Sequence, residues 1–245
     1  MFGLPAGTSA CLFDMDGVVT QTALVHAAAW KEMFDNFLRQ RAEQTGGKFV
    51  PFDSARDYED YVDGKPRLDG TRSFLASRGI SLPEGSPGDK PGTPTVQGLS
   101  NAKNDLVVDK IHTDGVKVYD GTIRYIKAVR AAGLRTAIVS SGANTVDVLN
   151  AAGIADLFDA RVDGIVASQR HLKGKPAPDT FLAAAHDLGV SPSQAAVFED
   201  AQSGVAAGHA GHFALVVGVD RVGQAEELRK HGADIVAKDL AELLD

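Results

Sequence analysis

Two aspartates separated by one residue stand directly after a short apolar run near the start of the chain. The run is ACLF at residues 10–13, and the segment DMDGVVT that follows contains Asp14, Asp16 and Gly17. If the strand continues, carboxylates two positions apart point to the same side, and the glycine lets the chain turn immediately afterwards. Such a pair can divide the work of group transfer, one oxygen attacking an electrophile while the other handles a proton. An Asp-x-Asp after a strand is also often only a solvated turn.

A second polar cluster combines hydroxyl groups with backbone amides. Residues 138–144 (IVSSGAN) place Ser140 and Ser141 at the end of an apolar stretch, just before a helix that we expect to begin near Asn144. Hydroxyls and backbone amides at a helix start form an anion site in outline. The same residues are equally common as a helix cap without any ligand.

Two further clusters supply a lysine and a second acidic pair. Residues 173–179 (KGKPAPD) contain Lys175, which could neutralise a phosphoryl oxygen, although a lone lysine in a loop is normally solvated. Residues 197–204 (VFEDAQSG) end an apolar stretch in Glu199 and Asp200. By itself this pair is more typical of a helix cap than of a metal site.

Short apolar runs that alternate with helical patterns predict an α/β fold with a Rossmann-like parallel sheet. We expect strands at residues 10–13, 136–139, 195–198, 213–219 and 234–237. Helical spacing predicts helices over 123–132 and 179–188, ending at Gly133 and Gly189, which suit the left-handed position after a helix. Open sheets of this class bind ligands at the carboxyl ends of their strands, so the four clusters should converge there.

The stretch from about residue 24 to residue 110 breaks this rhythm. It has helical patterning around 25–37 and little strand signal, so we expect a helical domain, here called the cap, at 24–110. The cap would be inserted between two parts of the core, 1–23 and 111–245. Within it, residues 81–98 are dense in proline and glycine and predict a loop, with a disordered linker as an equal alternative.

Composition restricts the class of protein. The 245 residues carry 25 Lys+Arg against 32 Asp+Glu, a formal net charge of −7, which argues against nucleic acid or anionic membranes as partners. Cys11 is the single cysteine, so an internal disulfide or thiolate cluster is excluded and a reducing cytoplasm is expected. Because we find neither a signal-peptide core nor a transmembrane stretch, we expect a cytoplasmic protein. We also expect it to be a monomer, and the negative charge favours a small soluble substrate.

The coincidence of four clusters at one sheet edge indicates a chemistry that no cluster indicates alone. Three acidic residues crowded together repel one another unless a divalent cation is present. Oxygen ligands of this kind suit Mg²⁺, which also accepts phosphate oxygens. The joint interpretation is Mg²⁺-dependent phosphoryl transfer.

Four motifs resemble, in order and spacing, those of the haloacid dehalogenase (HAD) superfamily. They are residues 14–19 (DMDGVV), Ser140, Lys175 and the pair Glu199-Asp200, and the match covers nearly the whole chain. Within it, a set of segments looks like the β-phosphoglucomutase subfamily, whose helical cap is inserted after the first motif. These segments are 13–20 (FDMDGVVT), 26–31 (HAAAWK), 174–179 (GKPAPD) and 198–200 (FED).

The resemblance implies a role for each core residue. Asp14 would be the nucleophile that becomes an aspartyl phosphate, and Asp16 would protonate the leaving sugar oxygen and later take a proton from the incoming hydroxyl. Ser140 and Lys175 would hold the transferring phosphoryl oxygens. Mg²⁺ would be bound by the Asp14 carboxylate, the Asp16 backbone carbonyl and Asp200, with Glu199 beside it.

The resemblance also implies substrate contacts from the cap. His26 would help Asp16 engage the sugar, although a lone histidine is otherwise typical of surface or interface packing. Gly64 and Arg67 match a loop whose arginine grips the non-transferring phosphate, a task that suits a guanidinium. Lys103 matches a second contact between the cap and the substrate.

The loop near residue 140 both matches and departs from the pattern. By the resemblance, Ser141 and Asn144 would reach the sugar or the distal phosphate. Residues 142–143 (GA) stand where well-known members carry Ser-Lys, so one contact to the distal phosphate is missing. Asp63 occupies a position that is often basic, and Gln21 replaces an aspartate. These departures concern the identity of the sugar phosphate and leave the chemistry intact.

Three functions are compatible with these residues. The resemblance implies a mutase that interconverts β-D-glucose 1-phosphate and glucose 6-phosphate through a bisphosphate intermediate. The alternative is a HAD-type sugar-phosphate phosphatase, which shares the Asp14 chemistry but transfers the phosphoryl group to water. A non-enzymatic binding or regulatory module is the third, and it would not need the complete catalytic set.

Overall fold

The computed structural model describes residues 2–244, and the chain divides into two compact units. The core holds the chain up to Thr22 and from Val116 onward, and the cap is Ala23–Gly115. The cap therefore extends beyond the 24–110 expected from the sequence. The reason is helix α3 (Val96–Asp114), which continues past residue 110 and ends at Gly115, whose φ of 72° is outside the helical range.

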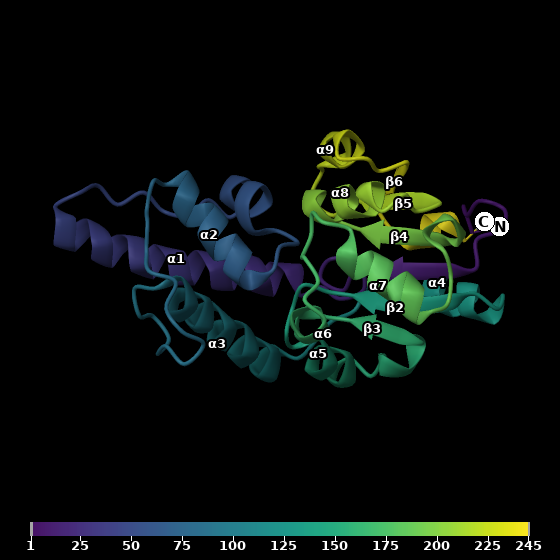
Figure 1. Ribbon diagram of the computed structural model, residues 1–245, viewed down its shortest axis with the longest axis horizontal. Helices are drawn as coiled ribbons and strands as arrows, with labels where there is room; N and C mark the ends of the chain where they lie inside the picture. The colour runs from purple at the N-terminus through teal and green to yellow at the C-terminus, as the bar shows by residue number, and fades with distance from the viewer. Residues whose placement is uncertain (1, 245) are drawn as a thin grey trace. The chain divides into compact units, whose positions relative to one another are not determined.

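The core is built on a six-stranded parallel sheet with strand order β3-β2-β1-β4-β5-β6 (Figure 1). The strands are β1 (Ala10–Phe13), β2 (Arg135–Val139), β3 (Ala160–Val162), β4 (Ala195–Glu199), β5 (Leu215–Val219) and β6 (Ile235–Ala237). Phe13 at the end of β1 pairs in register with Ile138 of β2 and Phe198 of β4. The segments that follow these three strands therefore emerge side by side at the carboxyl edge.

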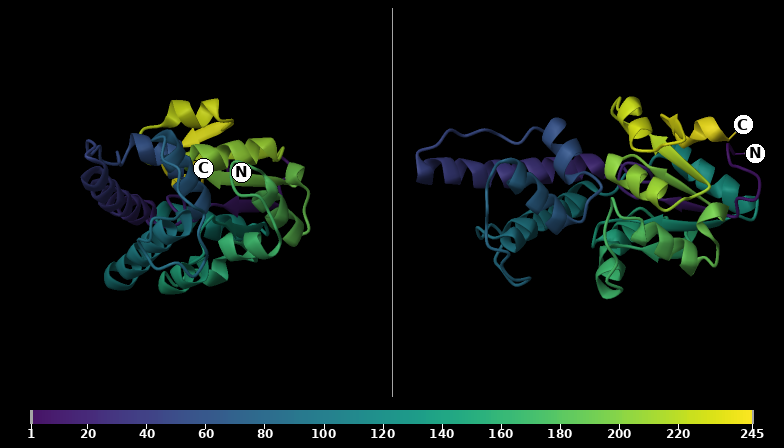
Figure 2. Two further views of the ribbon diagram at one scale, coloured as in Figure 1. Left: turned by 60° about the vertical axis from the view of Figure 1, so that its left-hand side comes forward. Right: turned by 45° about the horizontal axis from the view of Figure 1, so that its top comes forward.

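Both faces of the sheet are covered, which explains why its strands are continuously apolar in the sequence. The core helices are α4 (Asp120–Ala131), α5 (Thr145–Ala151), α6 (Gly164–Gln169), α7 (Asp179–Asp187), α8 (Gln202–Ala210) and α9 (Ala225–Lys230), with short helices η2 (Ala155–Leu157), η3 (Pro192–Gln194) and η4 (Leu240–Leu243) (Figure 2). On one face Leu12 and Val197 pack with Phe181 of α7. On the other, Phe13 and Phe198 contact Tyr125 of α4.

The α/β fold class predicted from the sequence is confirmed, and one strand was missed. The expected helices correspond to α4 and α7, and Gly133 and Gly189 have φ of 87° and 67°, as the left-handed position requires. Strand β3 was not predicted because it has three residues, lies at the sheet edge and is only partly buried at Ala160 and Arg161. Strand β3 therefore lacks the apolar run on which the prediction of strands depends.

Two predictions from the sequence concern membrane-spanning helices and the single cysteine. Within residues 2–244, none of the helices combines the length and apolar character needed to span a bilayer. Cys11 is a buried free thiol in β1, and burial raises the pKa of this thiol to about 12. The sulfur therefore stays protonated near neutral pH and is not a nucleophile there.

The cap has a hydrophobic core of its own. Its elements are α1 (Ala23–Thr45), the single-turn η1 (Tyr58–Val62), α2 (Arg67–Ser77) and α3. The ring of Phe34 is the centre of an aromatic cluster, with centroids 5.3 Å from Trp30, 5.4 Å from Phe52 and 4.1 Å from Phe74. These contacts join α1, α2 and the segment between them into one unit.

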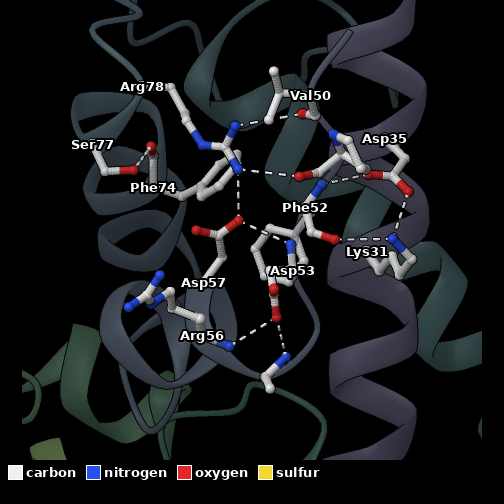
Figure 3. A network of polar contacts seen from close by, with 12 residues as sticks. Lys31, Asp35, Val50, Phe52, Asp53, Arg56, Asp57, Phe74, Ser77 and Arg78 are labelled. Atoms are coloured by element: carbon white, nitrogen blue, oxygen red, sulfur yellow. Dashed lines mark hydrogen bonds and ion pairs between the residues drawn. The ribbon is translucent and has the colours of Figure 1, made fainter.

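A polar network fixes the segment that leads from α1 to η1 (Figure 3). Arg78 Nη2 donates to Asp57 Oδ2 at 2.6 Å, and the Phe52 amide donates to Asp35 Oδ1 at 2.7 Å. Lys31 Nζ lies 2.9 Å from both Asp35 Oδ2 and the Phe52 carbonyl oxygen. Lys31, on the motif that resembled the family's cap helix, therefore has a structural contact within the cap.

The segment rich in proline and glycine is a loop for most of its length, but α3 begins inside the expected range 81–98. Thr95 caps this helix, accepting from the Gly98 amide at 2.9 Å. Asp89 Oδ2 accepts from Thr95 Oγ1 at 2.6 Å, and Asn101 Nδ2 donates to the Asp89 carbonyl at 2.9 Å. These bonds give the loop a defined conformation against the start of α3.

Candidate active site

Lys175 is the centre of a buried cluster at the carboxyl edge of the sheet. Its side chain is 1% exposed, and Nζ donates to Asp14 Oδ1, to Glu199 Oε1 at 2.5 Å and to the Val139 carbonyl at 3.4 Å. An ammonium has three donors, so all three are used. Burial alone would lower the pKa of Lys175, but the Asp14 and Glu199 carboxylates outweigh it and hold the pKa above its usual value. The group is therefore a fixed cation.

At Asp14, burial and the neighbouring carboxylates favour the neutral form of the side chain. Burial raises the pKa of its carboxyl well above the usual value, and the nearby Glu199 and Asp16 raise it further, while Lys175 opposes them. The negative charge at this edge is thus in excess of the one lysine. An additional cation would stabilise the charged forms of these carboxylates.

The acidic residues fit a divalent metal ion. Carboxylate oxygens of Asp14, Glu199 and Asp200 all lie within 4.8 Å of one another, and the three residues are buried. Gly17 gives Asp200 the room to approach, because a Cβ on Gly17 would lie 1.7 Å from Asp200 Oδ2. A donor set of oxygens only, with excess negative charge, matches the preference of Mg²⁺.

Glu199 is fully buried at the end of β4, with both carboxylate oxygens engaged. Oε1 accepts from Lys175, and Oε2 accepts from the Ala201 amide at 2.9 Å. Gly204 leaves room for this side chain, since a Cβ there would lie 1.8 Å from Oε1. Glu199 therefore orients Lys175 toward Asp14 as well as adding charge near the expected metal position.

The turn after β1 fixes Asp16. The Gly17 amide donates to the Thr20 carbonyl at 2.7 Å, with φ of 91° at Gly17, and Thr22 Oγ1 donates to Asp16 Oδ1. Thr20 Oγ1 is 2.6 Å from Thr22 Oγ1 and continues this chain of hydroxyl groups. Thr22 was not singled out in the sequence, because a threonine beyond the motif carries no signal of its own.

The loop after β2 holds the three predicted anion-binding residues. Ser140 is buried, and its Oγ accepts from the Gly142 amide at 3.0 Å. It follows Val139, whose carbonyl contacts Lys175, so Ser140 lies at the same edge as the acidic cluster. Ser141 is partly buried, and Asn144 immediately precedes α5, where the sequence predicted a helix start. Their substrate contacts stay predictions.

In the cap, two of the predicted substrate residues contact each other. Lys103 is 4% exposed, and its Nζ lies 2.7 Å from His26 Nδ1 and 4.8 Å from the centroid of the Trp30 ring. Because a lysine ammonium only donates, Nδ1 of His26 is the acceptor in this pair and the proton of a neutral ring is on Nε2. The contact sets both the tautomer and the orientation of His26.

The other two predicted cap residues lie on the turn that leads into α2. Gly64 has φ of 67°, and Arg67 is the first residue of the helix. Burial lowers the pKa of Arg67 while Asp105 opposes that effect, and the Arg67 Nε is a buried donor without a hydrogen-bond partner among residues 2–244. A buried guanidinium with an unused donor is suited to an anionic ligand.

Comparisons with known proteins agree with this geometry. The family model "haloacid dehalogenase-like hydrolase" matches residues 8–212. The chain is 58% identical over 247 residues to a protein of Mycobacterium tuberculosis named beta-phosphoglucomutase, covering 100% of this chain and 94% of that one. It is 33% identical to the beta-phosphoglucomutase of Bacillus subtilis, covering 96% and 91%.

A solved structure shows the same similarity in three dimensions. The crystal structure of beta-phosphoglucomutase from Clostridium difficile superimposes with a TM-score of 0.75 at 26% identity, covering 96% of this chain and 93% of that one. The similarity thus extends over both the core and the cap sequences.

Proposed function

Since the chain belongs to the haloacid dehalogenase-like hydrolase family, we propose that it is a β-phosphoglucomutase that interconverts β-D-glucose 1-phosphate and glucose 6-phosphate. The observation that carries this proposal is the buried contact of Asp14 with Lys175 beside Glu199 and Asp200 at the carboxyl edge of the sheet. It supplies a nucleophile, a fixed cation and a metal site for phosphoryl transfer. The full-length similarity to proteins named beta-phosphoglucomutase supports the choice of substrate.

Asp14 and Asp16 divide the reaction between them. An Asp14 oxygen attacks one phosphorus of the bound sugar bisphosphate, the bond from that phosphorus to the sugar oxygen breaks, and Asp16 gives its proton to that oxygen. The product of this half is an aspartyl phosphate. In the second half a sugar hydroxyl attacks the same phosphorus, Asp16 takes the hydroxyl proton, and the bond to Asp14 breaks.

The neighbouring groups stabilise the charge that spreads over the phosphoryl oxygens. Lys175, which contacts Asp14, supplies the positive charge beside these oxygens in this proposal, and Ser140 supplies a hydroxyl from the adjacent strand end. Mg²⁺ would be held by the Asp14 and Asp200 carboxylates and the Asp16 carbonyl, with Glu199 beside them. When bound, it neutralises negative charge on the transferring group.

The cap and the loop after β2 bind the rest of the substrate in this proposal. Arg67, on the turn that contains Gly64, pairs with the phosphate that is not transferred, since its buried Nε has a donor to spare. His26 and Lys103, which contact each other, bind the sugar in this proposal. Ser141 and Asn144 make the corresponding contacts from the core. A monomer fits this scheme because one chain carries every residue of the set.

A sugar-phosphate phosphatase is the second candidate, favoured by the hydrolase description of the matching family model. It would use the same Asp14 chemistry and differ only in the acceptor, which is water rather than a sugar hydroxyl. A difference of about 1.4 kcal/mol between the two barriers changes their rate ratio tenfold. Small changes in how water is excluded therefore decide between them.

One assay separates the candidates. The protein is incubated with Mg²⁺, β-D-glucose 1-phosphate and a trace of β-D-glucose 1,6-bisphosphate, and both glucose 6-phosphate and free phosphate are followed. We expect glucose 6-phosphate to form well ahead of phosphate, and the α anomer of the substrate to be the matched control that reacts poorly. Rapid phosphate release without the isomer would favour the phosphatase, and the absence of both products would favour a binding module.

The role of Arg67 can be tested with two substrates. Arg67→Ala is expected to lower mutase kcat/KM by about 10- to 100-fold, because a charged hydrogen-bonding partner of the distal phosphate is lost. Hydrolysis of p-nitrophenyl phosphate, which has no second phosphate, should change little. Arg72→Ala is the matched control, since Arg72 lies on the same helix and is paired with Glu84 at the cap surface. Equal losses for both substrates would contradict the assignment.

A further inference from the structure

Arg221 is a largely buried arginine in the loop after β5, and none of the sequence motifs includes it. Its side chain is 13% exposed, and the guanidinium lies over the Tyr119 ring, 3.5 Å from the centroid. Nη1 donates to the Lys238 carbonyl at 2.8 Å and lies 3.6 Å from Asp239 Oδ2. These contacts with Tyr119 and with the C-terminal segment restrict the position of the guanidinium.

The remaining donors of Arg221 are directed at the turn that carries the catalytic aspartates. Nε donates to the Gly17 carbonyl at 2.8 Å, and Nη2 donates to the Val18 carbonyl at 3.3 Å. The Val18 carbonyl also accepts from Thr122 Oγ1 at 2.8 Å. One guanidinium, more than 200 residues away in the sequence, thus binds two consecutive carbonyl groups of the turn.

Gly17 is restrained in both of the peptide units that it shares with its neighbours. Its carbonyl is bound by Arg221, and its amide donates to the Thr20 carbonyl. Because a peptide bond is planar and trans, an amide directed at Thr20 leaves the preceding carbonyl, that of Asp16, pointing the opposite way. Asp200 also packs closely against Gly17, since a Cβ on Gly17 would lie 1.7 Å from Asp200 Oδ2. A shift of this turn would therefore move Asp16 and disturb Asp200 together.

We propose that Arg221 is a positioning residue for phosphoryl transfer, which fixes the turn after β1 so that Asp16 and its carbonyl keep their orientation toward the reacting group. The inference rests on the proposed roles of Asp14 and Asp16. In this role Arg221 acts through the backbone of Gly17 and Val18 and not through a contact with the substrate. An arginine suits this task because its rigid fork reaches several carbonyl groups at once, whereas a lysine presents a single ammonium.

The test compares kcat with KM in Arg221→Met and Arg221→Lys. Arg221→Met is expected to lower kcat by about 10- to 100-fold through misplacement of the catalytic turn. KM should stay within about threefold of the wild-type value, since no substrate contact is removed. Arg221→Lys should recover part of kcat because it can still donate to one carbonyl. Both the mutase reaction and hydrolysis of p-nitrophenyl phosphate are measured, and kcat is expressed per folded molecule from thermal unfolding followed by circular dichroism.

Arg130→Met is the matched control for a merely structural role. Arg130 is also partly buried and donates to the Leu157 carbonyl, Thr136 and Asp159, but at the amino edge of the sheet. We expect it to lower the unfolding temperature without changing kcat per folded molecule. If Arg221→Met does not fold, Arg221→Lys decides, with a reduced kcat at a near-normal unfolding temperature as the supporting result.

The outcomes also separate this inference from the proposed function. A kcat for the Arg221 variants within about threefold of wild type, or a rise in KM alone, would overturn the positioning role while leaving the mutase reaction in place. Conversely, wild-type protein that hydrolyses p-nitrophenyl phosphate without forming glucose 6-phosphate would refute the mutase. In that case the effect of the Arg221 variants on kcat would still be measured with the hydrolysis of p-nitrophenyl phosphate.

Discussion

Asp14→Asn is expected to abolish phosphoryl transfer, with kcat lowered by at least about 10⁴-fold, because an amide cannot replace the attacking carboxylate. The same variant should be no less stable than the wild type when metal is removed with a chelator. Asp14 is a buried carboxylate crowded by Glu199 and Asp16, and the neutral amide of the same shape removes that repulsion. Thermal unfolding and the mutase assay, carried out on the same preparation, measure both effects.

A substitution of the same kind elsewhere provides the control. Asp187 pairs with Arg170 at the end of α7, and Asp187→Asn should leave kcat unchanged. An Asp14→Asn variant that keeps more than about one-hundredth of wild-type kcat would exclude Asp14 as the nucleophile. Loss of activity accompanied by marked destabilisation would instead indicate that Asp14 holds the fold.

The core of the site was predictable because its residues sit at strand ends. Asp14, Ser140 and Glu199 follow or end apolar runs that only a buried parallel sheet explains, and the sheet brings such ends to one edge. The position of Lys175 followed from its motif, but its full burial between two carboxylates did not. A lysine in a loop rich in proline gives no sign of burial until the loop is folded.

Contacts that depend on tertiary structure could not be predicted. Arg221 reaches Gly17 across some 200 residues, and the sequence around it has neither periodicity nor a motif. In the cap, the pairing of Arg78 with Asp57 likewise has no pattern in the sequence. Strand β3 escaped detection for a related reason, since three residues at a sheet edge are stabilised by their neighbour β2 rather than by burial of their own.

Lys175→Met is expected to destabilise the metal-free protein by about 3–5 kcal/mol, because it leaves Asp14 and Glu199 as buried carboxylates without their shared cation. It should also lower kcat by about 10³-fold or more through the loss of a charge on the phosphoryl oxygens. Urea unfolding and the mutase assay measure the two effects. Lys230→Met, which breaks a solvent-exposed pair with Glu227 on α9, should leave the stability nearly unchanged.

A double substitution separates the two roles of Lys175. Glu199→Gln removes one of the two carboxylates that the lysine neutralises, so the combination of Lys175→Met with Glu199→Gln should recover much of the lost stability. It should recover no activity, because the transferring phosphoryl group still meets no cation from the protein. If activity returned together with stability, Lys175 would be a structural counter-ion only, and the charge stabilisation assigned to it would have to come from elsewhere in the site.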